Sequence, residues 1–201
     1  ERDLARRRFD IPEGLSAAAF VGALSYDANK GFDTLISALA LLPTIDRPLI
    51  LVAGAGHLDY WRYRTSAAGL AGMVRFQGSV TDVPTFLAAA DVLVSPTRYD
   101  GYGMGVHEAL CRGIPALVTR RAGIAELYPA DLADLLLNNA ESAEELAFRL
   151  KWVFENRIRV QPAVNCLGSR LRQRSWERMS SDIVELVEAS KGSDLVGITN
   201  G

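Results

Sequence analysis

The sequence predicts an α/β protein with a single doubly wound parallel sheet of about six strands, followed by C-terminal helices. Three observations support this fold class. Apolar runs such as residues 17–24 have the length of strands that are buried on both faces. They alternate with segments whose apolar residues recur at helical spacing. Several runs end in a glycine-rich turn, and right-handed crossovers would then join the parallel strands.

The first half of the chain contains three strand-and-helix units. The run at 17–24 leads through a polar loop into a helix at 32–42, whose apolar residues follow helical spacing and which Pro43 ends. The other elements expected in this half are a strand at 48–56, a helix at 57–72, a strand at 73–78 and a short helix at 83–90.

The second half continues the alternation and then becomes helical. After the strand at 91–97, the glycine-rich stretch 99–105 opens a helix, and Gly113 supplies its C-terminal stop. A helix break is expected near Pro162, because proline removes a helical hydrogen bond. The remaining elements are a strand at 114–119, a last short strand at 133–137 and helices throughout 143–189.

These elements fit one domain at residues 16–190. The chain has 201 residues, of which 49% are hydrophobic and 23% charged, so it can bury a core of ordinary size. Residues 1–15 are charged and are interpreted as the remnant of an interdomain linker. Residues 191–201 lack periodicity and are expected to form a flexible tail.

Composition excludes several classes of protein. The formal net charge is -2 and the basic residues are spread along the chain, which disfavours nucleic acid as a partner. No apolar run approaches the ~20 residues that span a bilayer, and no signal-peptide core precedes the first strand. Cys111 and Cys166 lie far apart with no other ligand at metal-binding spacing, so neither a disulfide framework nor a zinc site is expected. A cytoplasmic protein fits these features best.

Three polar or glycine-rich segments are expected at the carboxyl ends of the strands, where open parallel sheets bind their ligands. They are residues 25–31, 54–57 and 99–105. Taken singly, a glycine after a strand is more often a tight turn than a ligand cradle. Their convergence at one edge predicts a binding site.

The helix that starts near Gly101–Met104 offers amides without intrahelical partners, at the positive end of the helix dipole. Such amides bind anions such as phosphate. Glu108 lies about one turn further on and leans back over the same site, where it could accept from a ribose diol; it could equally be a solvated helix residue. Asp100 could be a simple N-cap, and Lys30 either a surface lysine or a phosphate-binding cation. His107 points elsewhere and is expected to pack in the core or against a helix.

Five segments resemble a known family in order and spacing: FVGAL…KGFDTLISAL, LILVAGAG, VRFQGSV, LAAADVLVSPTRYDGYGMGVHEALCRGIPALVT and AGIAEL. They are similar to the C-terminal domain of family 4 retaining glycosyltransferases (glycosyl transferases group 1), which have the two-domain B-type fold. The similarity runs from about Phe20 to Glu126, and SWERMSSDIVELV resembles the family's closing helix. Asp100 and Glu108 match the family's two acids separated by seven residues.

The resemblance implies a Rossmann-like domain that binds a nucleotide-sugar donor, UDP- or GDP-linked, as substrate. Glu108 would hold the ribose hydroxyls, Asp100 the hydroxyls of the transferred sugar, and Lys30 the diphosphate leaving group. No metal or cofactor is implied, because the helix N-terminus and Lys30 stabilise the charge instead. The implied catalytic residues are Lys30 and Asp100. The residues implied to line the pocket for the nucleotide base are Gly78, Ser79 and Val80. The other implied substrate-binding residues are Gly22, Lys30, Asp100, Gly101, Tyr102, Gly103, Met104 and Glu108.

The sequence departs from the family's pattern at two positions. Asp100 stands where the family usually has Glu and is one methylene shorter. Ala23 follows Gly22, where the family commonly has Arg, so half of the usual basic pair on the diphosphate is missing. Arg120 and Arg121 are the candidates to replace the missing charge.

The resemblance implies the donor-binding half of a hexosyltransferase-type enzyme that transfers a sugar to an acceptor hydroxyl with retained configuration. The acceptor domain is not in this chain, so the chain alone is expected to bind nucleotide weakly and to be inactive. Two alternatives stay open: a non-catalytic nucleotide-sugar-binding or subunit-docking module, and a nucleotide-sugar epimerase. The base, the sugar, the acceptor, the oligomeric state and peripheral membrane attachment through the missing domain also stay open.

Overall fold

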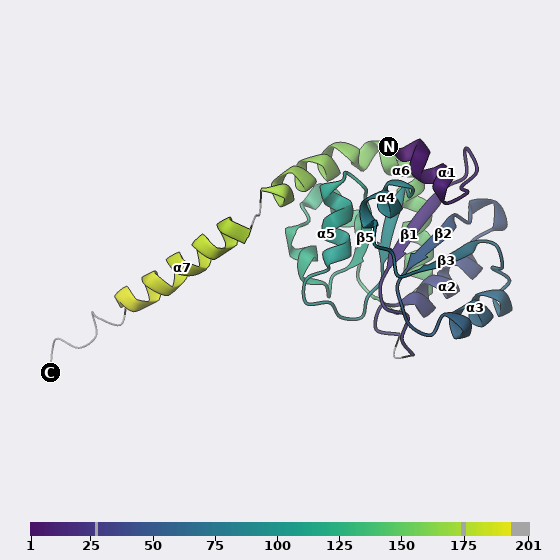
Figure 1. Ribbon diagram of the computed structural model, residues 1–201, viewed down its shortest axis with the longest axis horizontal. Coiled ribbons are helices and arrows are strands. Elements are labelled where there is room, and N and C mark those ends of the chain that lie inside the picture. Colours follow the sequence, from purple (N-terminus) through teal and green to yellow (C-terminus); the bar gives the residue numbers. More distant parts are fainter. Residues whose placement is uncertain (27, 174–175, 194–201) are drawn as a thin grey trace.

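The computed structural model describes residues 1–26, 28–173 and 176–193 of the chain. It contains a six-stranded sheet in the order β3-β2-β1-β4-β5-β6, and all of its strand pairs are parallel (Figure 1). The predicted fold class is confirmed. The strands are β1 (Ala17–Val21), β2 (Leu49–Ala53), β3 (Val74–Gly78), β4 (Val92–Ser95), β5 (Ala116–Thr119) and β6 (Leu136–Leu137).

Helices surround this sheet, and the longest of them, α6, packs against both α2 and α5. The α-helices are α1 (Arg2–Arg8), α2 (Phe32–Leu41), α3 (Leu58–Ala67), α4 (Val83–Ala88), α5 (Met104–Cys111), α6 (Ala143–Arg172) and α7 (Trp176–Ser193), and there are short 3₁₀ helices at Thr44–Asp46, Gly123–Leu127 and Ala130–Leu135.

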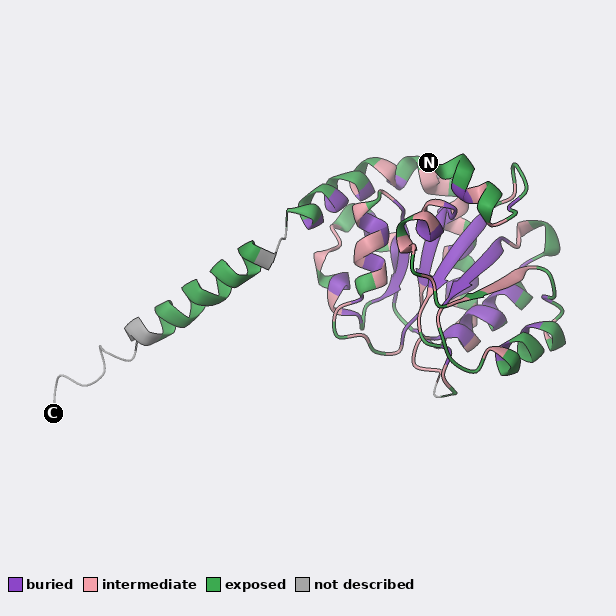
Figure 2. Ribbon diagram, in the orientation of Figure 1, coloured by how far each residue is buried: buried purple, intermediate pink, exposed green. Residues whose placement is uncertain are grey.

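The central strands are buried on both faces, as the apolar runs predicted (Figure 2). β1 presents three consecutive alanines with no exposed surface, Ala17 to Ala19. The indole of Trp61 on α3 is also buried, and its Nε1 donates to the backbone oxygen of Leu24 at 3.2 Å. A buried indole needs such a partner, so this bond fixes α3 beneath the loop that follows β1.

The direction of the strand order changes between β1 and β4. β1 pairs with β2 on one side and with β4 on the other, and the register places Ala18 beside Val92. The connections from these two strands run toward opposite ends of the sheet, and open parallel sheets bind their ligands at the carboxyl ends of the strands where the order reverses in this way. This edge is where the sequence predicted the binding site.

The strand expected at 133–137 is mostly a 3₁₀ helix. Ala130–Leu135 forms that helix and only Leu136–Leu137 pairs with β5. The buried residues Leu132 and Leu135 are three apart, which matches the three residues per turn of a 3₁₀ helix.

The helix break expected near Pro162 is absent. α6 is one helix of 30 residues that continues past Pro162. Pro162 lies on the exposed side, where water can bond the carbonyl of Ile158 that has lost its helical partner. The opposite side of α6 is held by buried residues such as Val160 and Val164.

The ends of the chain differ in how they pack. α1 contacts α4, and its Ala5 is buried. α7 continues to Ser193, so the first residues of the expected tail at 191–201 are helical, and residues 194–201 lie outside the described part. Residues 177–190 of α7 are exposed (Figure 2). Among the described residues, no helix has the length and apolar character needed to cross a membrane.

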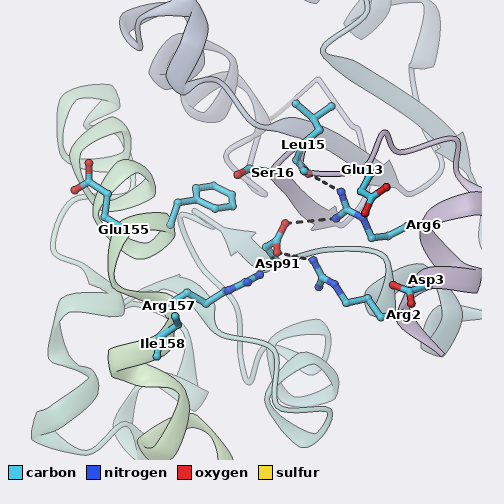
Figure 3. Close-up of a pocket in the computed structure, with 12 residues that line it drawn as sticks. Arg2, Asp3, Arg6, Glu13, Leu15, Ser16, Asp91, Glu155, Arg157 and Ile158 are labelled. Carbon is cyan, nitrogen blue, oxygen red and sulfur yellow. Dashed lines mark hydrogen bonds and ion pairs between the residues drawn. The ribbon is translucent and has the colours of Figure 1, made fainter.

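A cluster of ionic groups lies at the amino ends of the strands, next to a cavity of about 400 Å³ (Figure 3). The Asp91 carboxylate, 7% exposed, pairs with Arg2 at 2.6 Å, with Arg6 at 3.6 Å and with Arg157. It also accepts the amide of Ala17 at 2.9 Å. One carboxylate thus joins α1, β1, β4 and α6.

Candidate functional site

The candidate site is formed by loops at the carboxyl edge of the sheet, opposite the Asp91 cluster. Two isolated parallel bridges, Leu24 with Gly56 and Asp100 with Ala122, extend the sheet beyond the strands at this edge. Backbone hydrogen bonds join the loops to one another: the Arg98 amide donates to the oxygen of Asn29 at 2.8 Å, and the Gly123 amide to that of Asp100 at 3.2 Å. The β1–α2 loop (residues 22–31) carries Lys30, and the β4–α5 loop (residues 96–103) carries Asp100.

Gly31 lets these two loops approach closely. Its φ is +71°, and a Cβ at this position would lie 1.9 Å from the carbonyl oxygen of Pro96. No residue with a side chain can occupy that space without moving the backbone. The glycine therefore sets the distance between the start of α2 and the end of β4.

Lys30 and Asp100 form an ion pair across the two loops, with Nζ and Oδ2 2.7 Å apart. The side chains are 32% and 23% exposed, so both still reach solvent. Gly22 leaves room for the lysine stem, because a Cβ there would lie 3.1 Å from Lys30 Cγ. The structure thus brings together three of the predicted site residues.

The charge of Asp100 is stabilised in this position. Partial burial acts to raise the pKa of its carboxyl, but the hydrogen bond and charge of Lys30 outweigh this, together with the amides of Tyr102 and Gly103. The net effect holds the pKa of Asp100 below its usual value. Its Oδ1 accepts the Tyr102 amide at 3.3 Å, so Asp100 also orders the turn before α5.

Replacing Lys30 with methionine is expected to raise the pKa of Asp100, because its main stabilising partner is lost. Carbon-13 NMR titration of the carboxyl measures this. In the wild type the midpoint should lie below the usual value of about 3.9, so the pair stabilises the fold fully above that pH and loses this contribution as the pH falls through the lower midpoint. Equal midpoints in the two proteins would mean that the pair does not persist in solution.

The N-terminus of α5 presents unpaired amides to the same edge. Gly103 is the N-cap residue, in left-handed conformation with φ +101°, and no side chain caps the helix. Within the described part of the chain, the amides of Met104 and Gly105 have no hydrogen-bond acceptor. Gly101 and Met104 are exposed. The uncapped helix start that the sequence predicted is present, and the binding of an anion to it stays a prediction.

Glu108 is half-buried on α5, four residues after Met104 and therefore on the same helix face. Its carboxylate has no hydrogen-bond or ion-pair partner among the described residues. His107 is half-buried as well, and its Nδ1 bonds the Tyr102 hydroxyl at 2.8 Å. It therefore orients Tyr102 rather than packing in the core.

The three predicted base-pocket residues lie apart from Lys30 and Asp100. Gly78 ends β3, at the far edge of the sheet, and two strands separate it from β4. Its oxygen accepts the Gly54 amide at 2.8 Å, which joins this loop to the β2 loop. Ser79 is exposed and Val80 half-buried, so both are accessible.

The structure gives no support to the suggestion that Arg120 or Arg121 replaces the basic side chain that is missing at Ala23. Ala23 is exposed at the edge, but the Arg120 side chain donates to Asn138 at 2.9 Å. Arg121 is exposed. In the part of the chain that the structure describes, Lys30 is the basic residue bonded to the Asp100 carboxylate.

Two features of the site were missed in the sequence. Arg98 bonds Ala28 of the β1–α2 loop and Asp33 at the start of α2. Tyr26, in the same loop, stacks on His57 with ring centroids 3.5 Å apart. Each joins residues that are distant in sequence, and no local pattern signals such pairs. The described residues contain no cluster of acidic, His and Cys side chains that could hold a metal ion.

Residues 1–166 match the protein family described as glycosyl transferases group 1. Similar curated proteins include the lipopolysaccharide core biosynthesis glycosyltransferase LpsE of Rhizobium meliloti, 30% identical over 170 residues, which are 85% of this chain and 45% of LpsE. The GDP-mannose-dependent alpha-(1-6)-phosphatidylinositol dimannoside mannosyltransferase of Mycobacterium tuberculosis is 29% identical over 183 residues, 89% of this chain and 45% of that protein.

Among solved structures, HepE of Anabaena in complex with UDP and glucose has the same fold. Its TM-score is 0.78 at 21% identity, and the match covers 94% of this chain and 52% of HepE. The chain thus spans about half the length of the relatives that it matches.

Proposed function

Because the chain belongs to the glycosyl transferases group 1 family, as the C-terminal domain of the two-domain B-type fold, we propose that it is the donor-binding half of a retaining glycosyltransferase. Such an enzyme moves a sugar from a nucleotide diphosphate to an acceptor hydroxyl. The remaining half, which this chain does not contain, would supply the acceptor site. On its own, the chain would bind nucleotide weakly and transfer nothing.

One observation carries this proposal: the free amides of Met104 and Gly105 and the ammonium of Lys30 lie at the same edge of the sheet, at its switch point. Together they offer a site for two negatively charged phosphates. The carboxylate of Glu108 lies on the same helix face as Met104 and has no partner among the described residues, and it would accept the ribose hydroxyls. Gly78, Ser79 and Val80 would contact the base.

The ion pair between Lys30 and Asp100 suggests how the donor would be engaged. A bound diphosphate would compete for the Lys30 ammonium, which would release Asp100 to accept hydroxyls of the sugar. As the glycosidic bond breaks, negative charge grows on the departing diphosphate. Lys30 and the α5 amides would stabilise that charge without a metal, and positioning of donor and acceptor would supply the rest of the rate.

Calorimetric titration with UDP and GDP tests this function. HepE is described with UDP and glucose, and the Mycobacterium tuberculosis protein as GDP-mannose-dependent, so both nucleotides are suitable probes. We expect one of them to bind, and Glu108→Gln to weaken it by about tenfold to a hundredfold, because charged hydrogen bonds contribute about 1.5 to 3 kcal/mol each.

The control is Glu155→Gln, which removes an exposed carboxylate of α6 that lines the Asp91 cavity, at the opposite edge of the sheet (Figure 3). It should leave nucleotide binding unchanged. The function proposed here is wrong if neither nucleotide binds, or if Glu108→Gln binds as tightly as the wild type.

A second function is favoured by one observation, the exposed Ala23 where the family commonly carries Arg. With only half of the basic pair, the domain could bind a nucleotide sugar without activating it, as a sensing or docking module. Joining the chain to its acceptor domain and measuring hydrolysis of UDP-glucose separates the two. Binding without any turnover, with Ala23→Arg creating turnover, would favour the module.

The expected cytoplasmic location, the linker at residues 1–15 and the absence of a metal stay predictions.

A further inference from the structure

Arg98 lies in the β4–α5 loop, two residues before Asp100, and its side chain reaches across to the β1–α2 loop. Its two terminal nitrogens bond the Asp33 carboxylate at 3.1 and 2.8 Å, and one of them also donates to the backbone oxygen of Ala28. Its Nε donates to Glu141 at 3.0 Å. Its side chain is 25% exposed. One guanidinium therefore joins the start of α2, the loop before it and the segment before α6.

The backbones of the two loops are bonded around the same residue. The Arg98 amide donates to the oxygen of Asn29 at 2.8 Å, and the Thr97 hydroxyl donates to that oxygen as well. In return, the Asn29 side-chain amide donates to the oxygen of Tyr99 at 3.1 Å. These bonds place Lys30, the next residue after Asn29, directly opposite Asp100.

The segment held in this way has a strained backbone. Ala28 has φ +52°, a left-handed conformation that costs a residue with a side chain roughly 1 to 2 kcal/mol, and Gly31 has φ +71°. The Ala28 oxygen accepts both the Gly31 amide, at 2.7 Å, and the Arg98 guanidinium. Strain of this kind persists only where the surroundings impose it. Lys30 lies between the strained Ala28 and Gly31, where glycine accommodates the left-handed backbone.

We propose that Arg98 is a positioning residue: its forked guanidinium holds the β1–α2 loop against the β4–α5 loop so that the Lys30 ammonium faces Asp100 and the diphosphate site. This rests on the proposed function for its diphosphate step only. The geometry needs arginine, because four hydrogen bonds leave one planar group in fixed directions. A lysine would keep the charge without the fork.

Arg98→Lys tests this role because it preserves the positive charge. If Arg98 acts through Lys30, the variant releases the lysine, and the pKa of the Asp100 carboxyl rises toward its usual value of about 3.9 in a carbon-13 NMR titration. The affinity for UDP or GDP should fall by about tenfold, since small displacements of a positioned group have effects of this size or larger. The proposal would be overturned if Arg98→Lys had the same Asp100 titration midpoint and the same nucleotide affinity as the wild type.

A double-mutant cycle separates positioning from general stability. In a Lys30→Met background, Arg98→Lys should weaken nucleotide binding by no more than about twofold further, because its effect passes through the missing ammonium. An equal loss in both backgrounds would show that Arg98 acts independently of Lys30. The matched control is Arg47→Lys: Arg47 also bonds backbone oxygens, those of Leu42 and Ala40 at the other end of α2, and it should leave the Asp100 midpoint unchanged.

A second variant, Asp33→Asn, and the Asp100 titration decide the role of Arg98 in the two cases where Arg98→Lys binding data cannot. If Arg98→Lys does not fold, Asp33→Asn tests the same contact, because it removes the charge of the carboxylate that Arg98 bonds. This variant should also raise the titration midpoint of Asp100, and an unchanged midpoint would contradict the proposal. If the wild type binds neither nucleotide, the proposed function fails, whereas the Asp100 titration still decides the role of Arg98.

Discussion

Replacing Asp91 with alanine is expected to lower the free energy of unfolding by about 3 to 5 kcal/mol, the range for removing one partner of a buried ion pair. The carboxylate is 7% exposed and is bonded to three arginines and to the Ala17 amide. Its loss would leave the nearly buried Arg6 guanidinium, 11% exposed, without its ionic partner. It would also leave the first amide of β1 without an acceptor. Urea unfolding followed by circular dichroism measures the change.

Two comparisons make the Asp91 result specific. Asp91→Asn keeps an oxygen that can accept the Ala17 amide and should lose less stability than Asp91→Ala. Asp59→Ala removes a carboxylate that is 97% exposed and pairs with Arg62 on α3, and its effect should be close to the limit of detection. If Asp91→Ala and Asp59→Ala were equally mild, the Asp91 cluster would not stabilise the fold.

Gly31→Ala is expected to have the second large effect, a loss of roughly 2 to 5 kcal/mol. The left-handed backbone accounts for roughly 1 to 2 kcal/mol, and displacement of the Pro96 carbonyl, 1.9 Å from the new Cβ, for roughly 1 to 3 kcal/mol. Nucleotide binding should weaken as well, because Lys30 would move with its neighbour. Urea unfolding and calorimetry give the two readouts.

The control for Gly31 is Gly69→Ala, after the C-terminus of α3. Gly69 has φ +72°, nearly the same as Gly31, but nothing lies within 4 Å of its hypothetical Cβ. The difference between the two variants therefore isolates the contact with Pro96. Equal losses of stability in both would show that the loops can separate without penalty.

The sheet could be predicted from the sequence because its strands are buried on both faces and therefore appear as unbroken apolar runs. β1 and β2 are clear cases. Local patterns failed where the environment decides: Pro162 is tolerated because it faces solvent, and the leucines before β6 satisfy a 3₁₀ helix as well as a strand. Only the folded chain reveals which alternative is buried.

The candidate site could be located, but its contacts could not be deduced. Lys30 and Asp100 each follow a strand, so topology alone predicts that they share an edge. Their ion pair, and the clamp by Arg98, join residues about 70 positions apart and depend on side-chain directions that no spacing encodes. The free amides of α5 were predictable, since glycines before a helix leave its first turn uncapped.

Several glycines lie where two loops pack closely, and they limit which positions of this domain can be redesigned. A side chain at Gly54 or Gly123 would collide with the backbone of a neighbouring loop, so a randomised library that includes these positions would consist largely of misfolded members. Gly101, by contrast, has open space around it and no unusual φ, and Met104 projects into solvent. Substitutions intended to change the preferred sugar donor are therefore best made at Gly101 and Met104, where the fold has room for other side chains.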